Sequence, residues 1–250
     1  YGSKQPINAL SLQPIQSFDS QQMQQLGFHR ISDAVKYFAG VAVKDYGGQG
    51  GLKTISLRGL SSHHTAVSYD GLVLSNLQAG QIDIGRFTTD GVTQTSVALG
   101  HSSALLQTAR HYASAGVLII ETDGKAFLYS NKHASINGSL TLGSFNYYQP
   151  AFRLWQKINP TTSIGANVTY IKSKGDYPFT LKNGSLTTKE KRQNDDISSL
   201  NSELNLFHLV KEGVLLQSKV SYYHSERGLP GGVILYNHDA KERLWDDNFA

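Results

Sequence analysis

Residues 56–76, SLRGLSSHHTAVSYDGLVLSN, bring together several side chains that can do chemistry. The adjacent pair His63 and His64 offers two metal ligands, but neighbours on an extended chain point to opposite sides and chelate one ion poorly. The sequence contains neither a His-x-His nor a His-Glu-x-x-His spacing to support them. We therefore expect a polar loop tip here, with no metal site and no cofactor.

A glycine-rich run at residues 47–54, GGQGGLKT, superficially matches a phosphate-binding loop. Such a loop needs glycine directly before its lysine, because backbone amides there wrap the phosphates, and Leu52 occupies that place. The sequence also lacks a Gly-x-Ser-x-Gly nucleophile elbow. We predict that the protein is not an enzyme and that the run is a surface loop of the kind that carries ligand contacts.

Composition narrows the class of protein. The chain has 250 residues, no cysteine and a formal net charge of +4. Disulfides and thiolate metal sites are excluded, and the scattered basic residues give no stripe for nucleic acid. No apolar run reaches the ~20 residues of a membrane helix, whereas the strands of a membrane barrel are only half apolar.

Helix and strand signals mix before Gly124, which predicts a small α+β domain. Ser20 and Ser32 are candidate caps of two short helices that end at Gly27 and Gly40. Strands are expected at residues 41–45, 54–59, 66–70, 72–75, 93–99 and 116–122. The last of these is a continuous apolar run, which is typical of a buried central strand.

Two features stand out within this first half. Asp70-Gly71 lies between two apolar stretches and is a strong signal for a tight β-hairpin. Arg58 falls at the end of an expected strand, and burying an arginine is costly unless a carboxylate pairs with it. A position facing solvent is the alternative for Arg58 that the residues leave open.

After about Lys132 the pattern changes to long alternating segments, around residues 135–142, 163–170, 200–206 and 216–222. Each is roughly ten residues long, the length a tilted strand needs to cross a bilayer, with one apolar and one small or hydrophilic face. Residues 143–146 and 157–160 read as short turns. The stretch 173–196, including the charge run at 189–192, reads as a long polar loop, so we expect short turns on one side and long loops on the other.

The ordered motifs resemble the plug domain of TonB-dependent outer-membrane receptors. The matching elements are Asp33-Ala34-Val35, Ala39-Gly40-Val41, Leu57-Arg58-Gly59 and Tyr69-Asp70-Gly71. The later run GVTQTSVALGHSSALLQTARHYASAGVLIIET is similar to the closing section of that plug, although Leu99-Gly100-His101 replaces its usual Arg-Gly-Pro element. The layout is most similar to the cobalamin-transporter-like subgroup.

The resemblance implies an α+β plug domain at residues 1–124, followed at 125–250 by the first antiparallel strands of a transmembrane β-barrel. Such barrels have about 22 strands, so about six are expected here and the others in sequence beyond this chain. The implied function is energised import of a scarce nutrient, such as a siderophore, haem or cobalamin, without covalent chemistry. The implied location is the outer membrane of a Gram-negative bacterium, with TonB, the nutrient, membrane lipid and a surface lipoprotein as partners.

The resemblance also implies site residues. Those expected at the ligand-facing end of the plug are Tyr46, Gln49, Asn76, Gln78 and Gln81. Arg58 is expected to join plug and barrel wall, with Glu203 as a candidate carboxylate. The alternative from another class is a secreted β-sandwich for adhesion or carbohydrate binding, in which the apolar faces after residue 132 pack against each other.

Overall fold

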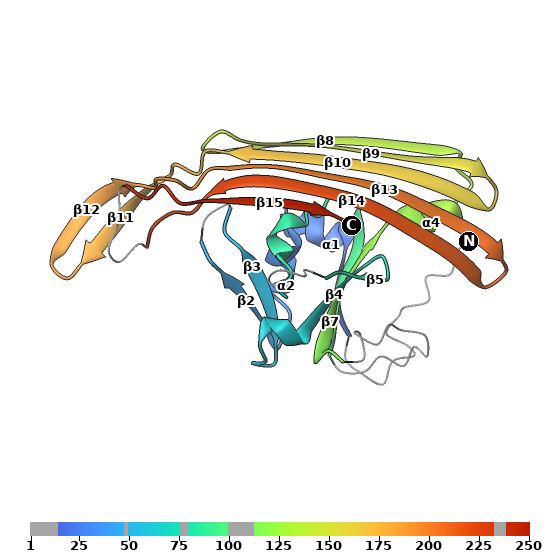
Figure 1. Cartoon of the computed structure of the whole chain (residues 1–250), viewed down its shortest axis with the longest axis horizontal. Coiled ribbons are helices and arrows are strands. Elements are labelled where there is room, and N and C mark those ends of the chain that lie inside the picture. The colour runs from blue at the N-terminus through green and yellow to red at the C-terminus, as the bar shows by residue number, and fades with distance from the viewer. Residues whose placement is uncertain (1–14, 48–49, 76–79, 100–112, 233–238) are drawn as a thin grey trace. The chain divides into compact units, whose positions relative to one another are not determined.

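A computed structural model of the chain describes residues 15–47, 50–75, 80–99, 113–232 and 239–250. They form two compact units, each built on its own sheet (Figure 1). The first unit runs to Tyr46 and resumes from Leu52 to Asp123, whereas the second combines Gly47–Gly51 with Gly124–Ala250. The assignment of these parts as plug and barrel domains at residue 124 stays a prediction.

The first unit contains a five-stranded sheet in the order β1-β6-β7-β4-β5. Strands β4 and β7 run parallel, and the other neighbours are antiparallel. The apolar run at 116–120 lies in the central strand, as predicted, whereas β1 has no counterpart in the sequence prediction. The bounds are β1 (Ile15–Asp19), β4 (Thr65–Tyr69), β5 (Leu72–Val73), β6 (Val92–Leu99) and β7 (Gly116–Thr122), with a separate hairpin of β2 (Val41–Asp45) and β3 (Lys53–Leu57).

Two short helices, α1 (Ser20–Gln25) and α2 (Ile31–Val35), begin differently from the prediction. Asp19, not Ser20, caps α1: its carboxylate accepts the Gln22 backbone N–H at 2.8 Å, and the Gln22 side chain accepts the Asp19 N–H at 3.0 Å. This reciprocal capping box satisfies two backbone donors at once. Ser32 lies inside α2 and is buried. The four residues of the predicted apolar face are all in the core: Ile31, Ala34, Val35 and Phe38. However, α2 ends at Val35 instead of Gly40, so that Phe38 follows the helix.

The Asp70-Gly71 turn joins β4 to β5 as predicted, with φ of +51° and +87°. The Asp70 carboxylate also accepts the Thr122 backbone N–H at 2.7 Å and its hydroxyl at 3.1 Å. This residue therefore fastens the end of β7 to the hairpin in addition to making the turn.

Replacing Asp70 by alanine is expected to reduce the local opening free energy of β7 by about 2–3 kcal/mol, because hydrogen bonds to a charged acceptor are lost. Asp70→Asn should reduce the opening free energy by about half as much as Asp70→Ala, since asparagine tolerates positive φ and keeps one hydrogen-bond acceptor. Hydrogen exchange of the β7 amides measures both changes. Equal protection in wild type and Asp70→Ala would contradict the fastening role.

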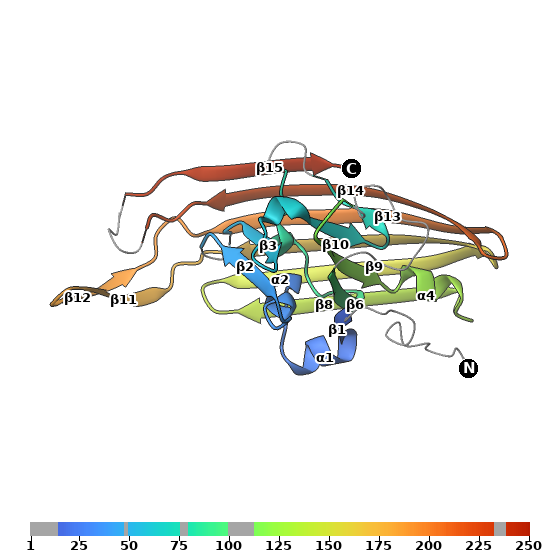
Figure 2. The same cartoon turned by 90° about the horizontal axis from the view of Figure 1, so that it is seen from below.

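The second unit is dominated by a six-stranded antiparallel sheet in the order β15-β14-β13-β10-β9-β8, drawn in Figures 1 and 2. Its strands are β8 (Ala134–Gly143), β9 (Tyr147–Asn159), β10 (Thr162–Ser173), β13 (Ile197–Lys211), β14 (Val214–Gly228) and β15 (Arg243–Phe249). The predicted antiparallel strands with alternating faces are confirmed. Of the helices in the described ranges, none is long and apolar enough to cross a membrane.

The long connection from β10 to β13 is more structured than predicted. It contains a hairpin of β11 (Pro178–Asn183) and β12 (Leu186–Lys191), which extends past the end of the sheet in both views (Figures 1 and 2). The charge run at 189–192 therefore begins within a strand. Lys191 lies 2.8 Å from Asp176 at the base of the hairpin and, chiefly by hydrogen bonding, holds the pKa of that carboxyl below its usual range.

The predicted separation of short turns from long loops is only partly correct. Because β8, β9 and β10 alternate in direction, the short turn at 144–146 lies at the same end of the sheet as the long connection. The Phe145 carbonyl accepts the Lys174 N–H at 3.0 Å, and the rings of Phe145 and Tyr177 lie 6.1 Å apart. The short turn thus supports the base of the long connection.

A small apolar cluster fixes the start of the second unit. Helix α4 (Gly124–Leu128) buries Phe127 and Leu128 against Trp155 and Phe207 of the sheet. The ring centroid of Trp155 lies 6.1 Å from that of Phe127 and 5.8 Å from that of Phe207. The segment that leads into the sheet is therefore anchored on it by aromatic packing.

Candidate functional site

The two faces of the six-stranded sheet have opposite chemistry. On one face large apolar side chains are exposed, with Leu142 71% and Leu204 62% accessible. On the other face Glu203 and Asn205 are only 6% and 7% accessible. A sheet that exposes its apolar residues and buries its polar ones suits a lipid-facing exterior and a hydrophilic interior.

Glu203 is part of a buried ion pair within the polar face. Its carboxylate lies 3.5 Å from the Lys219 ammonium, and the Asn201 side-chain amide donates to it at 3.3 Å. Both charged side chains are less than 8% accessible. The sequence suggested Glu203 as a partner for Arg58, and this carboxylate already has a cation beside it in its own unit.

Arg58 is exposed, and it lies just after β3 rather than within a strand. Its φ of +52° and the +73° of Gly59 turn the chain sharply there, and its N–H donates to the Gly40 carbonyl at 2.7 Å. Arg58 therefore lies just outside the strand that ends at Leu57, in the solvent-facing position that the sequence left open. Its predicted contact with a barrel-wall carboxylate stays a prediction.

Lys53, which raised the question of phosphate binding, is buried and committed to protein partners. Its ammonium contacts the Asp45 carboxylate across the β2–β3 hairpin. Its backbone N–H donates to the Asp83 carboxylate at 3.1 Å, and Asp83 also accepts the Gly85 N–H at 2.9 Å. These contacts give Lys53 a structural role in the hairpin, so the phosphate interpretation gains no support.

Of the five predicted ligand-facing residues, two lie within the described residues. Tyr46 is 52% accessible, and the Lys44 ammonium lies 4.8 Å from the centre of its ring. Gln81 makes a 2.6 Å hydrogen bond with the His63 ring. The remaining three, Gln49, Asn76 and Gln78, lie outside the described residues.

The contact between Gln81 and His63 gives the histidine a role that the sequence prediction missed. His63 belongs to a 3₁₀ turn, Ser62–His64, instead of an extended loop tip. It lies 18 residues from Gln81, and no local pattern links the two. Within the described ranges, no group of three or more metal-binding side chains is placed to hold an ion.

Arginines on the second unit were also missed. Arg227 Nη1 donates to the Gly50 carbonyl at 2.9 Å, and the same guanidinium contacts the Asp246 carboxylate. Arg192 Nη1 donates to the Gly231 carbonyl at 3.0 Å. Gly50 and Arg227 are 177 residues apart, a separation that no sequence motif spans.

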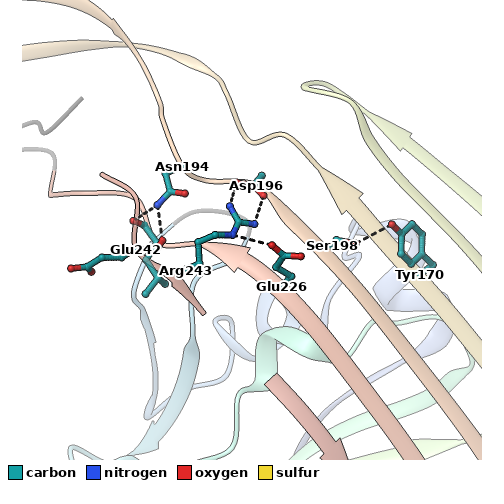
Figure 3. Close-up of polar contacts among 8 residues, drawn as sticks. Tyr170, Asn194, Asp196, Ser198, Glu226, Glu242 and Arg243 are labelled. Atoms are coloured by element: carbon teal, nitrogen blue, oxygen red, sulfur yellow. Dashed lines mark hydrogen bonds and ion pairs between the residues drawn. The ribbon is translucent and has the colours of Figure 1, made fainter. Parts of the chain in front are cut away.

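A third arginine ties together the stems of the two long connections (Figure 3). Arg243 lies between Asp196, at 2.8 and 3.1 Å, and Glu226, at 3.1 Å. The Asn194 side chain donates to the carbonyl oxygens of Leu229 at 3.0 Å and Glu242 at 2.7 Å. Residues 194–196 therefore brace both ends of the 229–242 connection.

Comparison with known proteins agrees with this architecture. Residues 9–111 match the family model described as the TonB-dependent receptor plug domain. The vitamin B12 transporter BtuB of Vibrio vulnificus (strain YJ016) is 28% identical over 154 residues, which cover 62% of this chain and 24% of that protein. The chain thus spans about a quarter of the length of this curated relative.

Solved structures show the same fold at low identity. The copper transporter OprC has a TM-score of 0.63 at 16% identity, over 87% of this chain and 31% of its own. The FrpB iron transporter from Neisseria meningitidis (F3-3 variant) has a TM-score of 0.61 at 17% identity, over 86% of this chain and 32% of its own. All three named proteins are transporters. Residues 9–111 therefore match the plug domain of TonB-dependent receptors, and the chain as a whole has the fold seen in these solved transporters.

Proposed function

We propose that the full-length protein containing this chain imports a scarce nutrient across the outer membrane of a Gram-negative bacterium, with energy supplied through TonB. The match to the plug domain carries this proposal. The named relatives transport vitamin B12, copper and iron, which supports a cobalamin, metal or metal chelate as the nutrient. No covalent chemistry is required of the protein.

The exposed apolar face of the sheet supports the membrane location. Apolar side chains at the centre of a lipid-facing strand are favourable, whereas charges there cost about 2–4 kcal/mol. The secreted β-sandwich is the weaker alternative, because it needs this face packed against a second sheet. In the proposed setting, membrane lipid contacts this face, and a surface lipoprotein is an additional proposed partner.

Nutrient uptake by a bacterial strain that lacks the full-length protein tests the function. Uptake of four probes is compared with that of the wild-type strain: cyanocobalamin, a ferric siderophore, haemin and copper. Uptake of one probe should be lost in the deletion strain and equally in a strain that lacks TonB. Unchanged uptake of all four probes would overturn the proposed nutrient class, and recovery of the full-length protein from membranes without detergent would overturn the location.

The proposed ligand contacts are Tyr46 and Gln81, together with Gln49, Asn76 and Gln78. Simultaneous Tyr46→Ala and Gln81→Ala should raise the Kd of the probe that is taken up by roughly 10-fold, because an exposed aromatic and an amide are removed together. Tyr129→Ala is the matched control, since Tyr129 is similarly exposed at 59% and is not a proposed contact. Equal Kd values in the double variant and the control would count against the assignment.

Arg58 remains the proposed contact between plug and barrel wall. Its exposed guanidinium offers a planar fork of donors that suits a carboxylate. Glu203 is one candidate partner, although its pairing with Lys219 favours a carboxylate elsewhere in the full-length protein.

A further inference from the structure

Arg227 holds Gly50 through a buried, oriented guanidinium. The side chain of Arg227 is 3% accessible, and Gly50 is buried as well. One amino group donates to the Gly50 carbonyl at 2.9 Å, and the other contacts the Asp246 carboxylate on the neighbouring strand β15. Because the guanidinium is planar and rigid, its contact with Asp246 fixes the direction in which it offers its remaining donors.

The glycines explain why this part of the chain reaches Arg227. A Cβ atom at Gly50 would lie 2.8 Å from the Arg227 Cβ, closer than real side chains approach each other. A Cβ atom at Gly51 would lie 1.7 Å from the Gly47 carbonyl oxygen, so that these two glycines approach each other closely. Gly47, Gly50 and Gly51 belong to the same compact unit as Arg227. Glycine at positions 50 and 51 is therefore required for packing.

We propose that Arg227 is a positioning residue for ligand binding, which fixes the described glycines of the glycine-rich segment (Gly47, Gly50 and Gly51) through Gly50, and that Asp246 in turn orients Arg227. Tyr46, a proposed ligand contact, directly precedes this segment and bonds through its N–H to the Leu52 carbonyl at 3.0 Å. Fixing the segment therefore limits the positions open to Tyr46. The role in ligand binding rests on the proposed function, whereas the anchoring of Gly50 does not.

Hydrogen exchange of the ligand-free full-length receptor tests the anchoring. In Arg227→Gln, amides of residues 46–52 should exchange about 10- to 100-fold faster, as expected for the loss of a hydrogen bond from a charged donor. Gly50→Ala should have a similar effect while leaving the guanidinium in place, and Arg227→Lys should be intermediate because it keeps the charge but loses the fork. Wild-type exchange in both Arg227→Gln and Gly50→Ala would overturn the proposal.

Two matched controls separate local from general effects. Arg243→Gln removes an arginine of the same sheet that contacts Asp196 and Glu226, and it should leave exchange at residues 46–52 unchanged. Gly138→Ala places a Cβ no closer than 3.9 Å to any neighbour and should also have no effect. Faster exchange at residues 46–52 in either control would overturn the specific role of Arg227.

Probe binding tests the positioning role separately. For whichever of the four uptake probes the wild-type receptor binds, Arg227→Gln should raise the Kd about 10-fold, whereas Arg243→Gln should leave the Kd unchanged. Faster exchange with an unchanged Kd would overturn the positioning role. A failure of the wild-type receptor to take up any probe would instead overturn the proposed function.

Discussion

Replacing Gly165 of β10 by valine is expected to destabilise the second unit by about 2–3 kcal/mol, the upper part of the range for overpacking a filled core. A Cβ atom at this position would lie 2.2 Å from Cζ3 and 2.3 Å from Cε3 of Trp155. The indole has little room to move, because it packs against Phe127 and Phe207 and its Cη2 atom lies 2.4 Å from the position of a Cβ on Gly124. Valine is favourable in strands, so the loss comes from packing and not from β propensity.

The loss should appear as a fall of about 1–3 °C in the temperature at which the full-length receptor unfolds, because a given loss of stability shifts that temperature less in a longer chain. Faster hydrogen exchange in α4 should accompany it, since Phe127 and Leu128 depend on the same packing. Gly138→Val is the control, because Gly138 lies in β8 of the same sheet with its nearest neighbour 3.9 Å from a Cβ. If both variants unfold at the same temperature, crowding around Trp155 does not determine the effect.

The long strands were predictable because their signal is repeated. Alternation over about ten residues assigns about five side chains to one face of a strand. Each segment must also have the same length, because each crosses the same bilayer. Hairpin β11–β12 escaped prediction because neither of its faces is consistently apolar, as in residues 186–191, LTTKEK. The α1 cap was missed by one residue because Asp19 and Ser20 are both good caps, and only Asp19 has a glutamine three residues later.

The site was only partly predictable for a different reason. Motif order identified the loops that carry Tyr46 and Gln81, because each loop follows a recognisable local element. The partners of these loops come from distant parts of the chain, such as His63 for Gln81. Arg58 was placed in a strand because Ser56-Leu57-Arg58 alternates, yet Gly59 permits the sharp turn that ends the strand at Leu57.

Removing one member of the Glu203–Lys219 pair is expected to reduce the opening free energy of these strands by about 3–5 kcal/mol, because the opposite charge stays buried without this partner. The two side chains are 6% and 7% accessible and lie on adjacent strands, β13 and β14. Glu203→Gln together with Lys219→Gln removes both charges, so the double variant should cost about 1–3 kcal/mol less than the sum of the two single changes. Hydrogen exchange of the β13 and β14 amides gives the opening free energies for this cycle.

An exposed ion pair serves as the comparison that isolates the effect of burial on the coupling energy. Asp33 and Lys36 are 3.9 Å apart on and just after α2, with side chains 40% and 45% accessible. Because water screens such a pair, the same cycle there should give a coupling within about 0–1 kcal/mol. A coupling at Glu203 and Lys219 no larger than this would mean that the polar face of the sheet is well hydrated. In that case removing either charge would lower the stability only slightly, and Glu203 would again be a candidate partner for Arg58.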